Sequence, residues 1–129
     1  MIQLDTSFLI RAMLAESPEA TSLRQWLRNR EAVAISAPAW AEFQCGPISE
    51  PIVAIAAQLL GDPLPFTGAE AALAGRLFNE TGRRRGSLID CMIAATAIEL
   101  GDELATSNHV DFKRFEKLGL TLAWKTRPA

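Results

Sequence analysis

The chain has 129 residues, of which 49% are hydrophobic and 22% are charged, and its formal net charge at pH 7 is -2. This composition is that of an ordinary globular protein and excludes an intrinsically disordered one. A chain of this length fits a single domain, residues 1–129, which can bury roughly two-thirds of the surface that it exposes when unfolded. The small net charge excludes a generally basic nucleic-acid-binding protein but allows a local basic patch.

The cysteines and apolar stretches indicate the cellular compartment. Cys45 and Cys91 lie in apolar helical segments and lack the CxxC spacing of a zinc site, so we expect reduced, buried thiols. The longest apolar stretch, residues 52–60, is too short to cross a membrane, and the amino terminus lacks the pattern of a signal peptide. The sequence therefore predicts a cytoplasmic protein without membrane contact.

The first half of the chain alternates between short apolar runs and helical spacing. Ile2 to Leu4 predicts a buried strand, and residues 6–15 then take the spacing of a helix. Ser17-Pro18 is typical of a helix start, because serine accepts amide hydrogen bonds and proline fits the first turn, so a second helix should run to about Arg30. A strand and two helices are expected next, over residues 32–35, 36–46 and 50–60.

The second half continues the alternation after an irregular stretch. Proline confines residues 64–66 to an edge strand or to extended chain. Thr67 and Glu70 have capping-box spacing and predict a helix to about Glu80. After the basic turn GRRRG, the remaining elements are an alanine-rich helix and two strands, expected over residues 87–101, 103–106 and 120–123.

Strands separated by helices require crossover connections. This order predicts an α/β fold with a mostly parallel central sheet and helices on both faces. In such a sheet, ligands bind beyond the carboxyl ends of the strands, where the following helices begin. We therefore expect the chemistry of this chain at that edge.

Five polar side chains that are far apart in the sequence fall at this edge. Asp5 directly follows the first strand, Glu42 and Asp90 lie in the first two turns of helices, and Asn108 and Asp111 follow a later strand. The topology thus delivers them to one rim and makes them candidate catalytic residues.

Each of these residues also has a purely structural explanation. Asp5 can cap the helix that begins at Thr6, and Asp90 forms a capping-box-like pattern with Ser87. Glu42 fits an exposed helix face. The two residues after the later strand fit an ordinary turn.

Three clustered carboxylates favour a bound cation. Like charges at about 4 Å repel by roughly 4 kcal/mol at an effective dielectric near 20, so the cluster would weaken the fold unless a cation intervened. Carboxylate, amide and water oxygens suit Mg²⁺ or Mn²⁺, whereas zinc more often binds His or Cys. The only histidine, His109, is expected to be a loop residue.

Such an acidic site can orient a water, lower its pKa and neutralise charge on a phosphodiester, which is nuclease chemistry. The basic run Arg83, Arg84 and Arg85 can hold a nucleic acid backbone beside the site, although a solvated turn explains it equally well. Four hydroxyl groups can bind a ligand water or a phosphate oxygen, or serve as turn and cap groups: those of Thr6, Ser7, Thr106 and Ser107.

Four segments in order resemble the motifs of PIN-domain ribonucleases, especially VapC-type toxins of toxin–antitoxin systems: LDTSFLI, PAWAEFQCG, GSLIDCMIAATAIELG and LATSNHVDF. The resemblance spans Ile2 to about Ala123, and four ordered motifs are far more specific than any one alone. It implies a PIN-like three-layer α/β/α fold and a Mg²⁺- or Mn²⁺-dependent endoribonuclease. It also implies a homodimer, and a small antitoxin that wraps the toxin and blocks its site.

The resemblance assigns roles to the residues at the sheet edge. It implies that Asp5 and Asp90 bind metal most directly, that Glu42 acts through a bound water, and that the fourth metal position falls on Asn108 or Asp111. Many relatives carry aspartate at the fourth position and often arginine before it. An asparagine oxygen ligates metal without adding charge, which leaves the metal affinity and the number of ions open.

Two other functions fit part of the pattern. A phospho-acceptor receiver domain also has an acidic Mg²⁺ pocket, but it needs paired acids after the first strand and a lysine near the last one, where this chain has Asp5 alone and no lysine before Lys113. A non-catalytic PIN-like module that binds RNA or protein is compatible with the uncharged Asn108. The sequence thus favours an endoribonuclease without identifying its RNA target.

Overall fold

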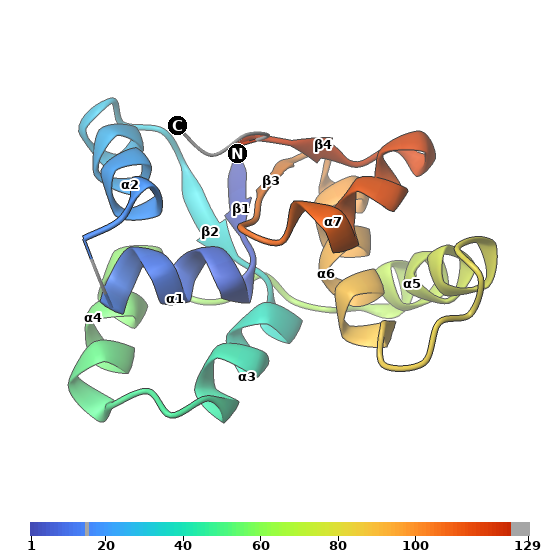
Figure 1. Cartoon of the computed structure of the whole chain (residues 1–129), viewed down its shortest axis with the longest axis horizontal. Helices are drawn as coiled ribbons and strands as arrows, with labels where there is room; N and C mark the ends of the chain where they lie inside the picture. The colour runs from blue at the N-terminus through green and yellow to red at the C-terminus, as the bar shows by residue number, and fades with distance from the viewer. Residues whose placement is uncertain (15, 125–129) are drawn as a thin grey trace.

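A computed structural model describes residues 1–14 and 16–124 and shows an α/β fold built on one sheet (Figure 1). Its strands are β1 (Ile2–Leu4), β2 (Val33–Ile35), β3 (Glu103–Ala105) and β4 (Thr121–Leu122). Its helices are α1 (Thr6–Leu14), α2 (Pro18–Arg28), α3 (Ala37–Cys45), α4 (Glu50–Leu60), α5 (Gly68–Glu80), α6 (Leu88–Leu100), α7 (His109–Phe112) and a 3₁₀ helix, η1 (Lys113–Leu118).

The strands are all parallel and lie in the order β2-β1-β3-β4, with Ile2 opposite both Val33 and Glu103. Helices α1 and α2 connect β1 to β2, and α3 to α6 return the chain across β1 to β3. Because such crossovers are right-handed, the two connections lie on opposite faces of the sheet (Figure 1). The predicted three-layer α/β/α fold with a parallel sheet is confirmed.

Strand β1 is buried on both of its faces. Leu4 has no exposed surface, and the polar Gln3 beside it is equally buried. The Gln3 amide donates to the Asp102 carboxylate at 3.0 Å and to the backbone carbonyl of Thr96 in α6 at 3.4 Å. A central parallel strand is expected to be covered in this way, because helices pack on both faces. The residue that follows β1 therefore begins in a buried environment.

The predicted helix starts are confirmed by their capping contacts. Ser17 accepts a hydrogen bond from the Ala20 amide at 3.0 Å, and the Glu70 carboxylate accepts from both the amide and the hydroxyl of Thr67 at 2.8 Å. Helix α6 ends at Leu100 and is capped by Gly101, whose φ of 70° is the left-handed conformation that favours glycine. In the described part of the chain, no helix combines the length and apolar character needed to cross a bilayer.

Two expectations differ from the structure in detail. His109 begins α7 instead of lying in a loop, and Cys45 is exposed, so only Cys91 is the buried thiol that the sequence suggested. The expected end of the first helix falls on Ala15, which lies outside the described residues. Residues 64–66 contribute a single bridge, between Leu64 and Ser36, as their proline predicts.

The capping contact of Ser17 predicts a measurable stability loss. Replacing Ser17→Ala removes the acceptor for the Ala20 amide and should lower the free energy of unfolding by about 1 kcal/mol. Urea denaturation measures this loss. Ser22→Ala, in the middle of the same helix, is the matched control and should change the free energy by less than about 0.5 kcal/mol. Equal effects of the two substitutions would contradict the assigned cap.

Candidate active site

Asp5 is a buried carboxylate at the carboxyl end of the central strand, with 3% of its surface exposed. Its Oδ1 atom accepts from the Phe8 amide at 2.8 Å, so it does cap α1. It also accepts from the Ser7 hydroxyl at 2.9 Å, and its Oδ2 atom accepts from the Thr106 hydroxyl at 2.5 Å. A cap needs only the first of these bonds. The remaining bonds fix the carboxylate between α1 and the end of β3.

Four of the five predicted catalytic residues line one cavity of about 330 Å³ at this edge. They come from four separate segments, which confirms that the topology brings them together. The cavity is lined by Asp5, Thr6, Ser7, Ile10, Glu42, Asp90, Asn108 and Phe112. All of the charged lining residues are acidic, and Ile10 and Phe112 supply apolar wall.

Asp90 and Glu42 line the cavity from two further helices. Asp90 lies in the first turn of α6 and is partly buried, while Glu42 lies in α3 and is exposed. The capping-box explanation of Asp90 is wrong, because the Ser87 side chain makes no capping bond and instead donates to the carbonyl oxygen of Arg84 at 2.7 Å. Asp90 is therefore available to a ligand.

Asn108 and Asp111 have different places in the site. Asn108 lines the cavity, whereas Asp111 stands behind it and accepts a hydrogen bond from the Asn108 amide nitrogen at 2.7 Å. Arg84 lies 3.9 Å from the other oxygen of Asp111. This chain of contacts orients the Asn108 amide and brings one residue of the basic turn next to the acidic cavity.

Of the other residues predicted to contact RNA, the two threonines form hydrogen bonds inside the protein and the arginines lie on the surface. Thr106 is fully buried and bonded to Asp5, and the Thr6 hydroxyl donates to the carbonyl of Ala39 in α3 at 3.1 Å. These two hydroxyls therefore hold the site together. Arg85 is exposed, whereas Arg83 binds the Asn79 side chain and lies over the Phe78 ring, 5.5 Å from its centroid.

The environment of Asp5 disfavours its charged form. Burial raises the pKa of the Asp5 carboxyl to about 6. Hydrogen bonds from Thr106, Phe8 and Ser7 act in the opposite direction, and the negative charge of Asp90 adds to the rise. An uncompensated carboxylate at this position thus costs folding free energy at neutral pH.

Asp90 is perturbed in the same direction. Burial raises its pKa to about 6, and the negative charges of Asp111 and Glu42 contribute further. The positive charges of Arg114 and Arg84 partly offset them. Arg114 was not predicted as a site residue. Its three side-chain nitrogen atoms are buried, and its guanidinium lies 4.6 Å from the centroid of the Phe115 ring.

The oxygen donors of this cavity fit a hard divalent cation that keeps part of its water shell. Among residues 1–14 and 16–124, no three His, Cys, Asp or Glu side chains converge closely enough to enclose a metal ion. The cavity instead offers the carboxylates of Asp5 and Asp90 and the amide of Asn108. Mg²⁺ is commonly held by one or two carboxylates with several waters, which matches this donor set better than a closed cage does.

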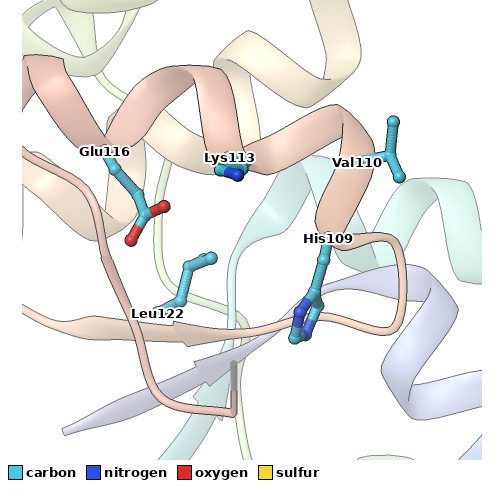
Figure 2. A pocket seen from close by; sticks show the side chains of 5 residues that line it. All are labelled: His109, Val110, Lys113, Glu116 and Leu122. Atoms are coloured by element: carbon cyan, nitrogen blue, oxygen red, sulfur yellow. The ribbon is translucent and has the colours of Figure 1, made fainter. Parts of the chain in front are cut away.

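A second cavity, of about 390 Å³, lies beside α7 and is distinct from the acidic one. It is lined by His109, Val110, Lys113, Glu116 and Leu122 (Figure 2). None of these is a predicted metal ligand. The His109 ring packs edge-on against Trp124, with centroids 5.9 Å apart. Although this cavity is larger, its lining lacks the convergent carboxylates on which nuclease chemistry depends.

The sequence matches the PIN domain family model over residues 2–118. The chain belongs to the PIN domain family. This match covers most of the chain and agrees with the α/β/α architecture and the acidic rim described above. A search of curated protein sequences found no match.

Solved structures of VapBC and VapC proteins share this fold. The chain is similar to VapBC2 of Rickettsia felis bound to a promoter DNA fragment, with 25% identity, a TM-score of 0.77 and coverage of 95% of this chain and 97% of that one. It is also similar to VapBC-1 of nontypeable Haemophilus influenzae, with 23% identity, a TM-score of 0.70 and coverage of 95% and 96%. VapC20 of Mycobacterium tuberculosis, a sarcin–ricin loop cleaving toxin, shares 20% identity with a TM-score of 0.63, over 99% and 100% of the two chains.

The pKa values of Asp5 and Asp90 predict how stability depends on pH without metal. Both are raised above the unfolded value, so their stabilising contribution is fully present below about pH 4 and is lost as the pH rises through about 6. In EDTA, Asp5→Asn should leave the melting temperature nearly unchanged at pH 4 and raise it by roughly 3 °C at pH 7.5.

Thermal unfolding at pH 4 to 8 measures this difference. Asp62→Asn, which changes an exposed aspartate outside the cavity, is the control and should give a flat difference across the range. An Asp5→Asn variant that is equally destabilised at pH 4 and pH 7.5 would contradict the assigned electrostatic strain.

Proposed function

We propose that this PIN protein is a VapC-type toxin, a Mg²⁺- or Mn²⁺-dependent endoribonuclease that hydrolyses phosphodiester bonds of RNA. The observation that carries the proposal is the single cavity that holds Asp5, Asp90, Glu42 and Asn108, with Asp5 buried and bonded from two directions. Membership of the PIN family supports nuclease activity. The similarity to a toxin that cleaves the sarcin–ricin loop supports RNA as the substrate.

Four side chains of the cavity, and Asp111 bonded to one of them, have a role in this proposal. Asp5, Asp90 and the amide oxygen of Asn108 would hold the metal, which when bound lowers the pKa of a water and neutralises phosphate charge. Glu42 is exposed at the cavity and would orient the attacking water and accept its proton. Asp111 would act through Asn108, whose amide nitrogen it binds.

The proposal includes partners. The relatives from R. felis and H. influenzae are VapBC complexes, which supports a small antitoxin as the partner of this chain. We also propose that the toxin acts as a homodimer, as the resemblance to VapC-type toxins implies, and that it is cytoplasmic, as its cysteines and short apolar stretches suggest.

Cleavage of mixed cellular RNA with Mn²⁺ tests the proposed activity. Removing a carboxylate that binds metal should lower the cleavage rate at least about 100-fold in Asp5→Asn and in Asp90→Asn, and chelation should abolish cleavage. Asp62→Asn should cleave at the wild-type rate. Sequencing of the cut ends would identify the target.

Three outcomes would contradict the proposal. Cleavage that survives both cavity substitutions would show that another site or a contaminant is responsible. A wild type that never cleaves RNA would favour the non-catalytic PIN-like binding module, with which the uncharged Asn108 is compatible. Cleavage that persists in chelator would show that the reaction does not require a metal ion. The receiver-domain alternative is excluded by the PIN family match, because that family has a different fold.

The exposed Arg85 predicts a separate effect on substrate binding. Arg85→Ala removes one cation of the basic turn and, if this turn contacts the RNA backbone, should raise the KM for RNA about threefold with kcat unchanged. It should also reduce the salt dependence of binding by about one charge. Steady-state kinetics at several salt concentrations measure both, with the exposed Arg28→Ala of α2 as control. A fall in kcat alone would argue against a contact with the RNA backbone.

A further inference from the structure

Glu19 is a charged residue with no exposed surface, although it lies in the first turn of α2 and not in the cavity. Its Oε2 atom accepts a hydrogen bond from the Ser107 hydroxyl at 2.6 Å, and the Arg11 guanidinium lies 3.8 Å away. Its Oε1 atom is buried without a hydrogen-bond partner in the described chain. Burying a carboxylate with so few partners costs folding free energy, so a role for Glu19 beyond stability is expected.

The contact with Ser107 continues into the acidic cavity. The Ser107 amide donates to the Ser7 hydroxyl at 3.2 Å, and that hydroxyl donates to Asp5 at 2.9 Å. The next residue back, Thr106, donates to the other oxygen of Asp5. Each hydroxyl in this chain has a single proton, so the direction of donation is fixed: Ser107 to Glu19, and Ser7 to Asp5.

Aromatic packing holds the elements at the two ends of this hydrogen-bond series in place. The Phe8 ring stacks on Trp26 of α2 with centroids 5.6 Å apart and meets Trp124 edge-on at 5.4 Å. Trp124 in turn contacts His109, whose ring stands on the side of α7 that faces the second cavity (Figure 2). Helix α2, which carries Glu19, is therefore packed against α1, and Phe8 of α1 is linked through Trp124 to His109, two residues after Ser107.

We propose that Glu19 is a positioning residue for the reaction: through Ser107 and Ser7, it holds the loop after β3 so that its donors meet Asp5. The proposal rests on the proposed nuclease function, because it gives Glu19 a role in presenting Asp5 to the metal. Glu19 touches neither the cavity nor the reacting atoms, and it acts by accepting the Ser107 proton. The hydrogen bond from the Ser107 hydroxyl to Glu19 orients Ser107 so that its amide donates to the Ser7 oxygen. The Ser7 hydroxyl proton is then directed to Asp5.

Two pairs of substitutions separate this role from a general effect on folding. Glu19→Gln keeps the size of the side chain but weakens the acceptor, and Ser107→Ala removes the donor. Ser107→Thr keeps a hydroxyl, and the exposed Glu16→Gln is the matched control for loss of a negative charge near the start of α2. The double variant Glu19→Gln/Ser107→Ala tests whether the two residues act as one unit.

Substitutions behind a metal ligand commonly cost 10- to 100-fold in metal affinity or activity, which sets the expected size. We expect Glu19→Gln and Ser107→Ala each to weaken Mn²⁺ binding about 10-fold in calorimetry and to lower kcat about 10-fold. The KM for RNA should stay within about twofold, because the substrate contacts are untouched. The double variant should be no worse than either single variant, and Ser107→Thr and Glu16→Gln should match the wild type.

Amide hydrogen exchange of metal-free protein gives a readout that does not depend on activity. The Ser107 amide should exchange about 10-fold faster in Glu19→Gln, while amides in the middle of α5, remote from this chain of bonds, stay unchanged. A folded Glu19→Gln variant with wild-type exchange, Mn²⁺ affinity and kcat would overturn the proposal, as would additive losses in the double variant. A wild type that neither binds Mn²⁺ nor cleaves RNA would instead refute the proposed function. Ser107→Ala tests the same contact if Glu19→Gln does not fold.

Discussion

The burial of the Asp5 carboxylate at the end of the central strand is the constraint around which the site is organised. A carboxylate with 3% of its surface exposed must be bonded from nearby, and donors reach it from α1 and from the end of β3. Those bonds do not restore the pKa of Asp5 to its ordinary value, which burial still raises to about 6. A bound hard cation would stabilise the charged form of Asp5 further than the hydroxyl and amide donors do.

Asn108, the residue at the proposed fourth metal position, is uncharged, but the negative charge of Asp111 lies next to it. Asn108 lines the cavity without a charge, but Asp111 binds its amide nitrogen and raises the pKa of Asp90. Arg84 lies against the outer oxygen of Asp111 and partly offsets the acidic field. The basic turn and the acidic cavity are thus linked through the Asp111 side chain, and in the proposed function Arg84 would supply positive charge where RNA approaches the site.

The sequence predicted most of the fold and the convergence of the site, because both follow from local patterns and from topology. The alternation of strands and helices fixes a parallel sheet, and a parallel sheet places Asp5, Glu42, Asp90 and Asn108 at one edge. The contact between Glu19 and Ser107 could not be predicted, since the two residues are 88 positions apart and meet only when α2 packs on α1. As acidic residues in a first turn are common, Glu19 gave no signal of its burial.

Crystals grown with Mn²⁺ test the central claim most directly, because anomalous scattering locates the ion without reference to activity. The account predicts an anomalous peak in the acidic cavity, within bonding distance of both Asp5 and Asp90, and its loss in Asp5→Asn. An ordered cavity with no peak, or Asp5 and Asp90 directed into separate regions of solvent, would contradict it.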